Sequence, residues 1–289
     1  MEKYMARDIT ERINEAYGTL SKGQKRIAAV ILEEYEKAAY LTAARLGKLV
    51  GVSESTVVRF ADTLGYDGYS EFQHAVQELV RTKLTPNQRI KMTNARIGGS
   101  DILECVMESD VSKIRYTLER LDRDTFNATV DAILSAKTVY ITGARSTEPL
   151  ARLFSYNLSL IFDNVKFINP TSSAEVFEQM FSIGEDDTLI AVSFPRYSSK
   201  IVNAARYARE CNATVIGFTD AETSPLSKYS TLLISAQSDM AAYMDSLVAP
   251  LSIVNAIIVA ITKKRGSEIV ERFNRLEKIW DEYDVYTKR

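Results

Sequence analysis

The chain has 289 residues, of which 46% are hydrophobic and 26% are charged, and its formal net charge is -2. A chain of this length can bury roughly 75% of the surface that its unfolded form exposes, so it needs no disulfide or metal to build a core. The small net charge excludes binding to nucleic acid or membranes through overall charge, and any such binding requires a local patch.

The cysteines, the histidine and the apolar stretches indicate the compartment. Cys105 and Cys211 lack metal-site spacing, and the single histidine, His74, cannot complete a site, so we expect no metal and two core thiols in a reducing compartment. The charged N-terminus has no secretory apolar core. The apolar stretch 246–261 contains a proline and an asparagine and is too short to span a bilayer. We expect a soluble, cytoplasmic protein without a membrane partner.

Three segments differ in pattern along the chain. Residues 1–81 predict short helices with almost no strand, and residues 101–289 predict helices followed by alternating strands and helices. Residues 82–100 are polar, contain one proline and two adjacent glycines, lack apolar periodicity and indicate a linker. Three residue pairs in the first segment have capping-box spacing: Asp8 and Glu11, Ser21 and Gln24, and Ser70 and Gln73.

Residues 42–66, TAARLGKLVGVSESTVVRFADTLGY, have the pattern of a helix-turn-helix. A first helix is expected from Thr42. Gly51 suits the left-handed position that ends such a helix, and Ser53 is placed to cap a second one. The apolar residues expected on the buried side of the first helix are Leu46, Leu49 and Val50, and those of the second are Val57, Phe60, Ala61 and Leu64.

The opposite side of the second helix is polar, with Arg59 and Asp62 among its residues. A recognition helix presents its N-terminal residues to base edges, while other cations contact the phosphates. We expect base or phosphate contacts from Ser53, Ser55, Thr56 and Arg59, and backbone contacts from Arg45 and Lys48, with Lys22, Lys25 and Arg26 as further candidates. The alternative is a helical hairpin with a merely solvated face, because residues 1–90 hold 13 Lys and Arg against 12 Asp and Glu.

The third segment predicts an α/β/α sandwich with a mostly parallel sheet. Two helical patterns precede short, continuous apolar runs separated by helices, which is typical of parallel strands covered on both faces. The expected strands are residues 138–142, 165–168, 188–193, 214–219 and 231–235, and two long helices close the chain. Ligands of such sheets bind at the carboxyl ends of the strands.

Two strand-to-helix turns in this segment have residues suited to an anion. The first strand is followed by Gly143 and then by Ser146 at an expected helix start, where free amides and the helix dipole favour negative charge. The third strand is followed by a loop with several hydroxyls and a cation, from Ser193 through Arg196 to Ser198 and Ser199. Serines at such turns also simply cap helices. No dinucleotide or Walker-type motif is present in the sequence, so we expect no nucleotide cofactor.

The strings LSKGQKRIAAVIL and LGKLVGVSESTVVRFADTLGYDGYSEFQ resemble the N-terminal domain of RpiR-type bacterial transcription regulators. The α/β segment resembles the sugar-isomerase (SIS) domain of the same regulators. The resemblance implies operator DNA and a phosphosugar as partners. It implies that Ser146 matches the first phosphate-binding serine of SIS domains, that Ser193 matches the opening serine of the second motif, and that Ser198 matches its closing threonine.

The sequence departs from that family pattern at three places. Arg145 replaces a small residue, Pro195 and Arg196 replace a serine and a glycine, and Leu247 follows Ser246 where many regulators have arginine. We expect Arg145 and Arg196 to contact a phosphate or carboxylate, with solvent exposure or pairing to an acidic neighbour as the alternative.

Three functions remain open from the sequence. The preferred one is a ligand-responsive transcription regulator, acting as a homodimer or a dimer of dimers through the helix from Asp101 and the C-terminal helix through Trp280. The second is a sugar-phosphate isomerase with a helical association domain, for which Glu148 and Glu175 are possible bases, although the helix dipole explains both residues more simply. The third is a DNA-binding protein whose sugar pocket has decayed.

Overall fold

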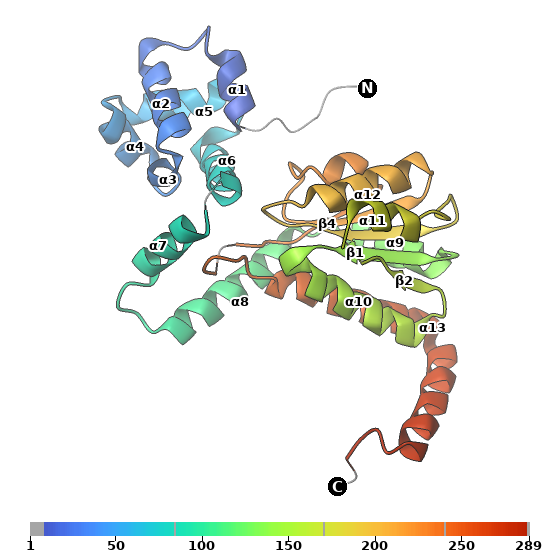
Figure 1. Ribbon diagram of the computed structural model, residues 1–289. Coiled ribbons are helices and arrows are strands. Elements are labelled where there is room, and N and C mark those ends of the chain that lie inside the picture. Colours follow the sequence, from blue (N-terminus) through green and yellow to red (C-terminus); the bar gives the residue numbers. More distant parts are fainter. Residues whose placement is uncertain (1–8, 84, 170, 240, 288–289) are drawn as a thin grey trace. The chain divides into compact units, whose positions relative to one another are not determined.

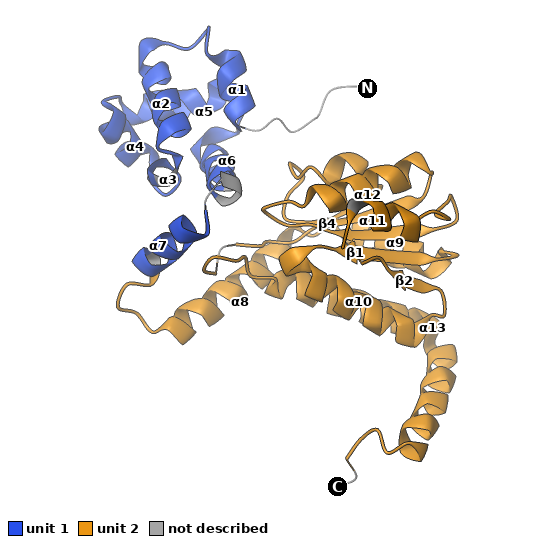
Figure 2. Ribbon diagram, viewed as in Figure 1, with its two compact units in different colours: residues 1–96 blue, residues 97–289 orange. Residues whose placement is uncertain are grey.

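The computed structural model describes residues 9–83, 85–169, 171–239 and 241–287. The chain forms two compact units, residues 1–96 and residues 97–289 (Figure 2). The division falls inside the segment 82–100 that the sequence indicates as a linker. Among the described residues, no helix combines the length and apolarity needed to cross a membrane.

The first unit is helical in all its described elements (Figure 1). Its core packs Ile13, Ile27, Leu46 and Phe60 out of contact with solvent, and the ring of Phe60 meets that of Phe72 edge to face at 5.6 Å between centroids. Its helices are α1 (Ile9–Ala16), α2 (Lys22–Glu33), α3 (Tyr35–Ala38), α4 (Ala43–Val50), α5 (Glu54–Thr63), α6 (Gly68–Lys83) and α7 (Pro86–Ile97), the last ending at the division between the units.

Of the three predicted capping boxes, one is confirmed, one is wrong and one lies outside the described residues. The capping box at Ser21 is confirmed, because its hydroxyl accepts from the Gln24 amide at 3.3 Å and its amide donates to the Gln24 side chain at 3.0 Å. The box at Ser70 is wrong, because α6 begins two residues earlier and contains Ser70. The box at Asp8 lies outside the described residues.

The segment 82–100 contains helix α7, which the absence of apolar periodicity did not predict. The start of α7 is marked by local polar chemistry instead. Thr85 and Gln88 exchange bonds as a capping box, with the Thr85 amide donating to Gln88 Oε1 at 2.9 Å. Pro86 is the first helical residue, where its missing N–H costs nothing. The proline that suggested a linker therefore starts a helix.

The second unit has the expected α/β/α fold, with a five-stranded parallel sheet in the order β2-β1-β3-β4-β5. Its strands are β1 (Val139–Gly143), β2 (Val165–Phe167), β3 (Thr188–Val192), β4 (Thr214–Thr219) and β5 (Leu232–Ser235). Its helices are α8 (Ile102–Arg120), α9 (Arg123–Ser135), α10 (Glu148–Ile161), α11 (Ser173–Gln179), α12 (Ser199–Glu210) and α13 (Val248–Glu282).

Helices cover both faces of the sheet (Figure 1). Alternate residues of a strand point to opposite faces, and in β1 Ile141 packs with α9, α10 and α13 whereas Tyr140 packs with α11 and α12. In β3, Ile190 and Leu189 divide in the same way. Burial on both sides explains why the strands are continuous apolar runs.

The strand order contains a reversal that locates a crevice. From β1 the chain crosses to β2 on one side, and then returns to place β3 on the other side of β1. In open parallel sheets, ligands bind outside the carboxyl ends of the strands at such a switch point. Gly143 pairs with Val192 in the β1–β3 register, so the two turns that follow leave the sheet at the same level.

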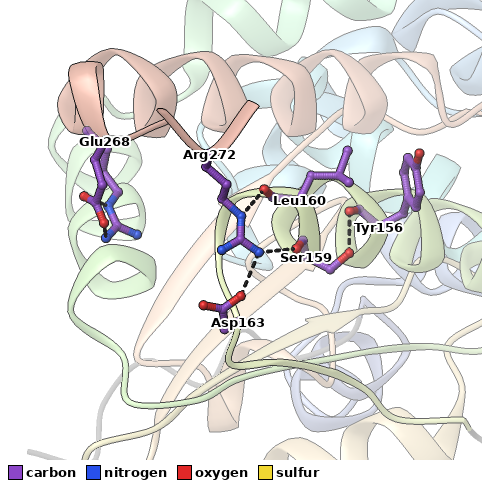
Figure 3. Close-up of polar contacts among 7 residues, drawn as sticks. Tyr156, Ser159, Leu160, Asp163, Glu268 and Arg272 are labelled. Carbon is purple, nitrogen blue, oxygen red and sulfur yellow. Dashed lines mark hydrogen bonds and ion pairs between the residues drawn. The ribbon is translucent and has the colours of Figure 1, made fainter. Parts of the chain in front are cut away.

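The two long helices predicted at the end of the chain are confirmed: both are included in α13, and they meet at a break in the helical backbone at Gly266. Helix α13 has 35 residues, and its backbone turns at Gly266, where φ is 40° and ψ is -107°. Beyond the bend, Arg272 is bonded to the end of α10: its Nε donates to the Leu160 carbonyl at 2.6 Å, and a terminal nitrogen lies 2.7 Å from the Asp163 carboxylate (Figure 3). This contact lowers the pKa of Asp163, through the hydrogen bond first and the charge of Arg272 second.

Candidate functional site

The helix-turn-helix of the first unit forms as its sequence predicts. Thr42 precedes α4 and its hydroxyl accepts from the Arg45 amide at 3.3 Å. Gly51 ends α4 with φ of 68°, a left-handed value that a side chain would strain. Ser53 caps α5 by accepting from the Thr56 amide at 3.3 Å. The two helices are therefore joined by the short turn 51–53.

Helix α5 divides into a buried and an exposed side. Val57, Phe60 and Ala61 are fully buried, and Arg59 and Asp62 are exposed, as the sequence predicts. The expectation for the first helix is wrong at one residue, because Leu49 is 51% exposed. It follows Lys48 and precedes the buried Val50, and one step along a helix turns the side chain by about 100°.

The polar residues expected to contact DNA gather at the start of α5. The hydroxyl of Ser53 lies 2.9 Å from that of Ser55 and 2.8 Å from that of Thr56. Arg59 Nε donates to the Ser55 carbonyl at 3.2 Å, which holds the guanidinium along the helix surface. Arg45 and Lys48 are exposed on α4.

Two residues of α2 support the motif, and one of them, Arg26, is among the further candidates for DNA contact. Arg26 donates to the Gly51 carbonyl at 3.0 Å and so fastens α2 to the turn between α4 and α5. Gln24 donates to the Thr63 hydroxyl at 3.0 Å, which joins α2 to the end of α5. Sequence reasoning missed both contacts because their partners are far apart along the chain.

In the second unit, the turn after β1 is fixed by Gly143 and Thr147. A Cβ added to Gly143 would lie 2.9 Å from both the Ala151 Cβ and the Thr147 carbonyl oxygen, so only glycine lets α10 start this close to the strand. The Thr147 hydroxyl is buried and lies 3.1 Å from the Ala144 amide and 3.0 Å from the Val192 carbonyl. Thr147 thereby ties the carboxyl end of β1 to that of β3.

The residues just before Thr147 face outward. Ser146 and Arg145 are exposed in a single 3-10 turn, Arg145–Thr147, directly before α10. Arg145 has φ of 60°, a left-handed conformation that costs a non-glycine residue about 1–3 kcal/mol. Such strain is found preferentially at binding and catalytic sites.

The loop after β3 is built around Ser193. This residue is 2% exposed, and its hydroxyl accepts from the Ser198 amide at 3.3 Å. Ser198 precedes α12, and its own hydroxyl makes no capping hydrogen bond within the described part of the chain. Ser199 and Arg196 are exposed. The loop is thus folded by Ser193, while Arg196 and Ser199 face outward.

The turn after β4 joins this loop. The Tyr197 hydroxyl donates to Asp220 Oδ1 at 2.9 Å, and the same oxygen accepts from the buried Thr219 hydroxyl at 3.1 Å. A charged residue directly after a buried strand was a signal available in the sequence, but Asp220 was not singled out there. The turns after β1, β3 and β4 therefore meet at one edge of the sheet through side-chain contacts.

Both units match known domain families. Residues 7–83 match the family model of the helix-turn-helix domain of the rpiR family, and residues 132–260 match that of the SIS domain. The chain belongs to the RpiR-type transcription regulators. The two matched regions coincide with the helix-turn-helix unit and the parallel sheet described above.

Relatives of the regulator match along nearly its whole length. The HTH-type transcriptional regulator HexR of Escherichia coli (strain K12) is 25% identical over 285 residues, which cover 94% of this chain and 93% of that protein. HexR of Pseudomonas aeruginosa is 23% identical over 285 residues, covering 94% of this chain and 95% of that protein.

Two solved structures share the fold of the regulator. The Vibrio vulnificus NanR protein complexed with ManNAc-6P has a TM-score of 0.60 at 21% identity, covering 96% of this chain and 99% of that chain. The sugar isomerase domain of an RpiR transcription factor from Sphaerobacter thermophilus has a TM-score of 0.57 at 20% identity, covering 60% of this chain and 96% of that chain.

The carboxylates considered as bases in the regulator have local partners. Glu148 pairs with Arg152 one turn along α10, at 2.8 Å. Glu175 accepts a bond from the Thr171 hydroxyl in the turn before α11. His74 is exposed on α6, in the other unit. Within the described ranges, no group of three or more His, Cys, Asp or Glu is placed to hold a metal ion. Cys105 and Cys211 are half-buried, and Cys211 packs against the buried core.

A cavity of about 500 Å³ lies at a different place in the regulator, beside the bend of α13. Its lining includes Ala136 and Asn164, which precede β1 and β2, together with Arg265, Arg272 and Phe162. It therefore adjoins the amino ends of the strands, opposite the edge where the three turns meet. Arg265 lies 5.0 Å over the ring of Phe162, and Arg272 is occupied with the end of α10 (Figure 3).

Proposed function

We propose that the α/β unit of this transcription regulator binds a phosphorylated sugar or a related anionic sugar metabolite at the carboxyl ends of β1 and β3. The observation that carries the proposal is the convergence of two strand-to-helix turns at the switch point of the sheet, tied together by Thr147. Each turn opens a helix, α10 or α12, whose first amides and dipole favour an anion. A relative of the same fold, NanR, forms a complex with ManNAc-6P.

In this proposal the residues of the two turns hold the anion, and all of them except the half-buried Ser198 and the buried Ser193 are exposed. Ser146, Ser198 and Ser199 donate hydroxyl and backbone hydrogen bonds, and Arg196 adds a charge-assisted bond that offsets the hydroxyl absent at Pro195. Arg145 contributes charge from the first turn. Ser193 acts indirectly, because its hydroxyl holds the Ser198 amide.

The first unit binds operator DNA through the start of α5. Ser53, Ser55, Thr56 and Arg59 lie together there, and Arg45 and Lys48 approach the phosphates. Binding of the anion in the second unit shifts the DNA affinity, which requires that the anion favours one of two conformations. The regulator acts in the cytoplasm. It catalyses no reaction, and the two carboxylates considered as bases each have a partner near their own helix start, Glu148 with Arg152 and Glu175 with Thr171.

We infer that the regulator is a homodimer joined through α8. Its outer side carries apolar residues at the spacing of a helix–helix seam, all at least 36% exposed: Leu103, Met107, Val111, Ile114 and Leu118. Burial of such a stripe against a second copy removes a large apolar patch from water. A dimer also presents two α5 helices to paired half-sites, as its affinity for DNA requires.

The DNA-binding part is tested by selecting duplexes from a random library and measuring fluorescence anisotropy at several salt concentrations. We expect a specific duplex with salt-dependent affinity, and about a tenfold or greater loss with Arg59→Ala. Arg206→Ala, on α12 in the other unit, is the control and leaves the affinity unchanged. Absence of any selected duplex would remove the regulator function.

The ligand-binding part is tested by thermal shift with a panel of hexose 6-phosphates, including N-acetylmannosamine 6-phosphate, and sugar acids. One compound should raise the melting temperature of the wild type, by mass action on the folded state. The shift should shrink with Ser146→Ala and Arg196→Ala and persist with Ser135→Ala, a serine at the end of α9. No shift with any compound contradicts phosphosugar binding and favours a decayed pocket.

The isomerase alternative and the dimer each have a direct measurement. Proton NMR of glucose 6-phosphate incubated with the protein should show no fructose 6-phosphate, whereas turnover lost in Glu148→Gln or Glu175→Gln establishes the enzyme.

Sedimentation equilibrium should give a dimer that Met107→Glu dissociates. Phe181→Glu, at an 82% exposed residue after α11, is the matched control and leaves the dimer intact.

A further inference from the structure

A continuous series of hydrogen bonds runs from the loop after β3 to helix α8. It begins at Tyr197, whose hydroxyl donates to Asp220 at 2.9 Å. The buried Thr219 donates to the same carboxylate, and its carbonyl accepts from the Ala236 amide at 2.9 Å. These contacts join the turns after β3, β4 and β5 at the edge where the anion site is proposed.

The series ends on α8. Gln237, the residue after Ala236, donates its amide to the Thr117 hydroxyl at 2.9 Å. Thr117 is 5% exposed, so water cannot replace this bond without movement of the helix or the turn. The loop that carries Tyr197 is thus connected to Thr117 through these hydrogen bonds and the peptide bond between Ala236 and Gln237.

A second contact fastens the same turn to α8 two helical turns earlier. The Ser246 hydroxyl, at the far end of the segment after β5, donates to Asp110 Oδ1 at 2.7 Å. Lys113 lies 3.3 Å from the same oxygen and donates to the Ser109 hydroxyl at 2.6 Å. Lys113 is only 5% exposed, and a buried cation that loses its partner is strongly disfavoured. Both of these partners of Lys113 lie on α8, so breaking the Ser246 bond does not leave the cation unpaired, and Lys113 holds the Asp110 carboxylate in place as the acceptor for Ser246.

Helix α8 is also the element through which the chain enters the second unit. It is the first helix after α7, and residues 98–101 alone connect the two helices. Its buried side carries Lys113 and Thr117, and a neighbouring side, about 100° around the helix, carries the apolar stripe proposed for the dimer. Helix α8 therefore carries both the stripe proposed for the dimer and the connection to the DNA-binding unit.

We propose that residues 236–239 and 241–246, together with α8, form the relay by which the bound anion changes DNA binding. The relay rests on the proposed function, because it needs an anion at the loop 193–199. The anion favours one position of Tyr197, the bonds through Asp220 and Thr219 pass that position to Gln237, and Thr117 and Asp110 move α8. Coupling of this kind is a difference in affinity between two states and is reciprocal between anion and DNA.

The test is hydrogen exchange with mass spectrometry on the full-length protein. The probe is an equimolar mixture of glucose 6-phosphate, fructose 6-phosphate and N-acetylmannosamine 6-phosphate. In the wild type we expect the mixture to slow exchange in peptides covering both 193–199 and 102–120. Thr117→Val removes the hydroxyl with little change in shape, and should keep the effect at 193–199 while losing that at 102–120.

Thr117→Ser is the matched control, because it keeps the hydroxyl and should restore the effect on α8. Ser246→Ala, at a partly exposed residue, gives a second test if Thr117→Val fails to fold, and should at least halve the effect on α8. With the selected duplex, the mixture should change the wild-type dissociation constant about 5-fold or more, and change that of Thr117→Val less than twofold.

The outcomes separate the two proposals. Protection at 193–199 without any change at 102–120 in the wild type overturns the relay and leaves the proposed function standing. Equal protection of α8 in the wild type, Thr117→Val and Ser246→Ala also overturns it. No protection at 193–199 contradicts the proposed phosphosugar site itself, and the relay falls with it.

Discussion

Helices α5 and α12 both begin with closely spaced serines, yet the two starts are satisfied differently. At α5, the Ser53 hydroxyl accepts from the Thr56 amide and closes the helix start within the chain. At α12, the described structure gives the Ser198 hydroxyl no capping bond, and the Ser198 amide is instead held by Ser193. The backbone differs accordingly, with ψ of 154° at Ser53 and 118° at Ser198.

A serine before the first residue of a helix caps that helix at Ser53 and does not cap it at Ser198. A serine at a helix start stabilises its own helix when its backbone directs the hydroxyl to the third amide, as at Ser53. At α12 a second serine, Ser193, holds the turn, and the proposed function assigns the Ser198 hydroxyl to the anion. The residue type is the same in both places, and the neighbouring contacts decide whether the hydroxyl caps its own helix.

The largest expected effect concerns Thr147, which ties the turn after β1 to the end of β3. Thr147→Val leaves the buried Ala144 amide without its acceptor, which costs about 1–3 kcal/mol of unfolding free energy. Urea denaturation measures this loss, and the ligand-induced thermal shift should disappear with it. Thr147→Ser, which keeps the hydroxyl, should retain most of both. If Thr147→Val binds ligand as the wild type does, the two turns are not held together by this contact.

The comparison itself is tested by the same substitution at both helix starts. Ser53→Ala removes a cap and should cost about 1 kcal/mol of unfolding free energy. Ser198→Ala should change it by less than about 0.5 kcal/mol, because no cap is lost, while weakening ligand binding about tenfold. Denaturation and ligand titration of both variants measure the difference. Equal stability losses at the two serines would mean that Ser198 is an ordinary cap.

Arg145 gives a smaller effect of mixed sign. Arg145→Gly relieves the left-handed strain but adds freedom to the unfolded chain, so we expect stability within about 1 kcal/mol of the wild type. Its ligand affinity should fall if the guanidinium contacts the anion, as proposed. Arg145→Ala, which keeps the strain without the charge, is the control and should be the less stable of the two variants. Thermal unfolding with and without ligand separates these contributions.

The smallest effect concerns the C-terminal end of α10, where Arg272 donates to the Leu160 carbonyl and pairs with Asp163. The folded-state pKa of Asp163 lies below its ordinary value of 3.8, so the pair stabilises the fold above that pH and the contribution is lost as the pH falls through the lowered pKa. Asp163→Asn should lower the melting temperature slightly at pH 7, and should not lower it at a pH below the lowered pKa of Asp163. Arg206→Ala, whose weak pair spans 3.9 Å on α12, is the comparison. A difference that does not depend on pH would assign the effect to packing.

The sequence predicted those features whose causes are local. Gly51 and Ser53 mark their turn because a left-handed backbone and a cap each require particular residue types. The strands were recognised because burial on both faces leaves continuous apolar runs. Helix α7 was missed because its polar sequence has no apolar period, and only the Thr85–Gln88 box marks its start.

The features that escaped prediction depend on partners far along the chain. Thr147 contacts Val192, Tyr197 contacts Asp220, and Ser246 contacts Asp110, and none of these pairs has a spacing that could be read from the sequence. The candidate site was therefore predictable as a set of turns, and its internal connections were not.

The strand order has a consequence for the way the protein is made. The DNA-binding unit consists of neighbouring helices near the start of the chain, and contacts between near neighbours form early. The proposed anion site needs β1 beside β3, so it cannot exist until the ribosome has passed the start of α12. Because N-terminal domains fold first during synthesis, the DNA-binding unit folds before the proposed anion site forms.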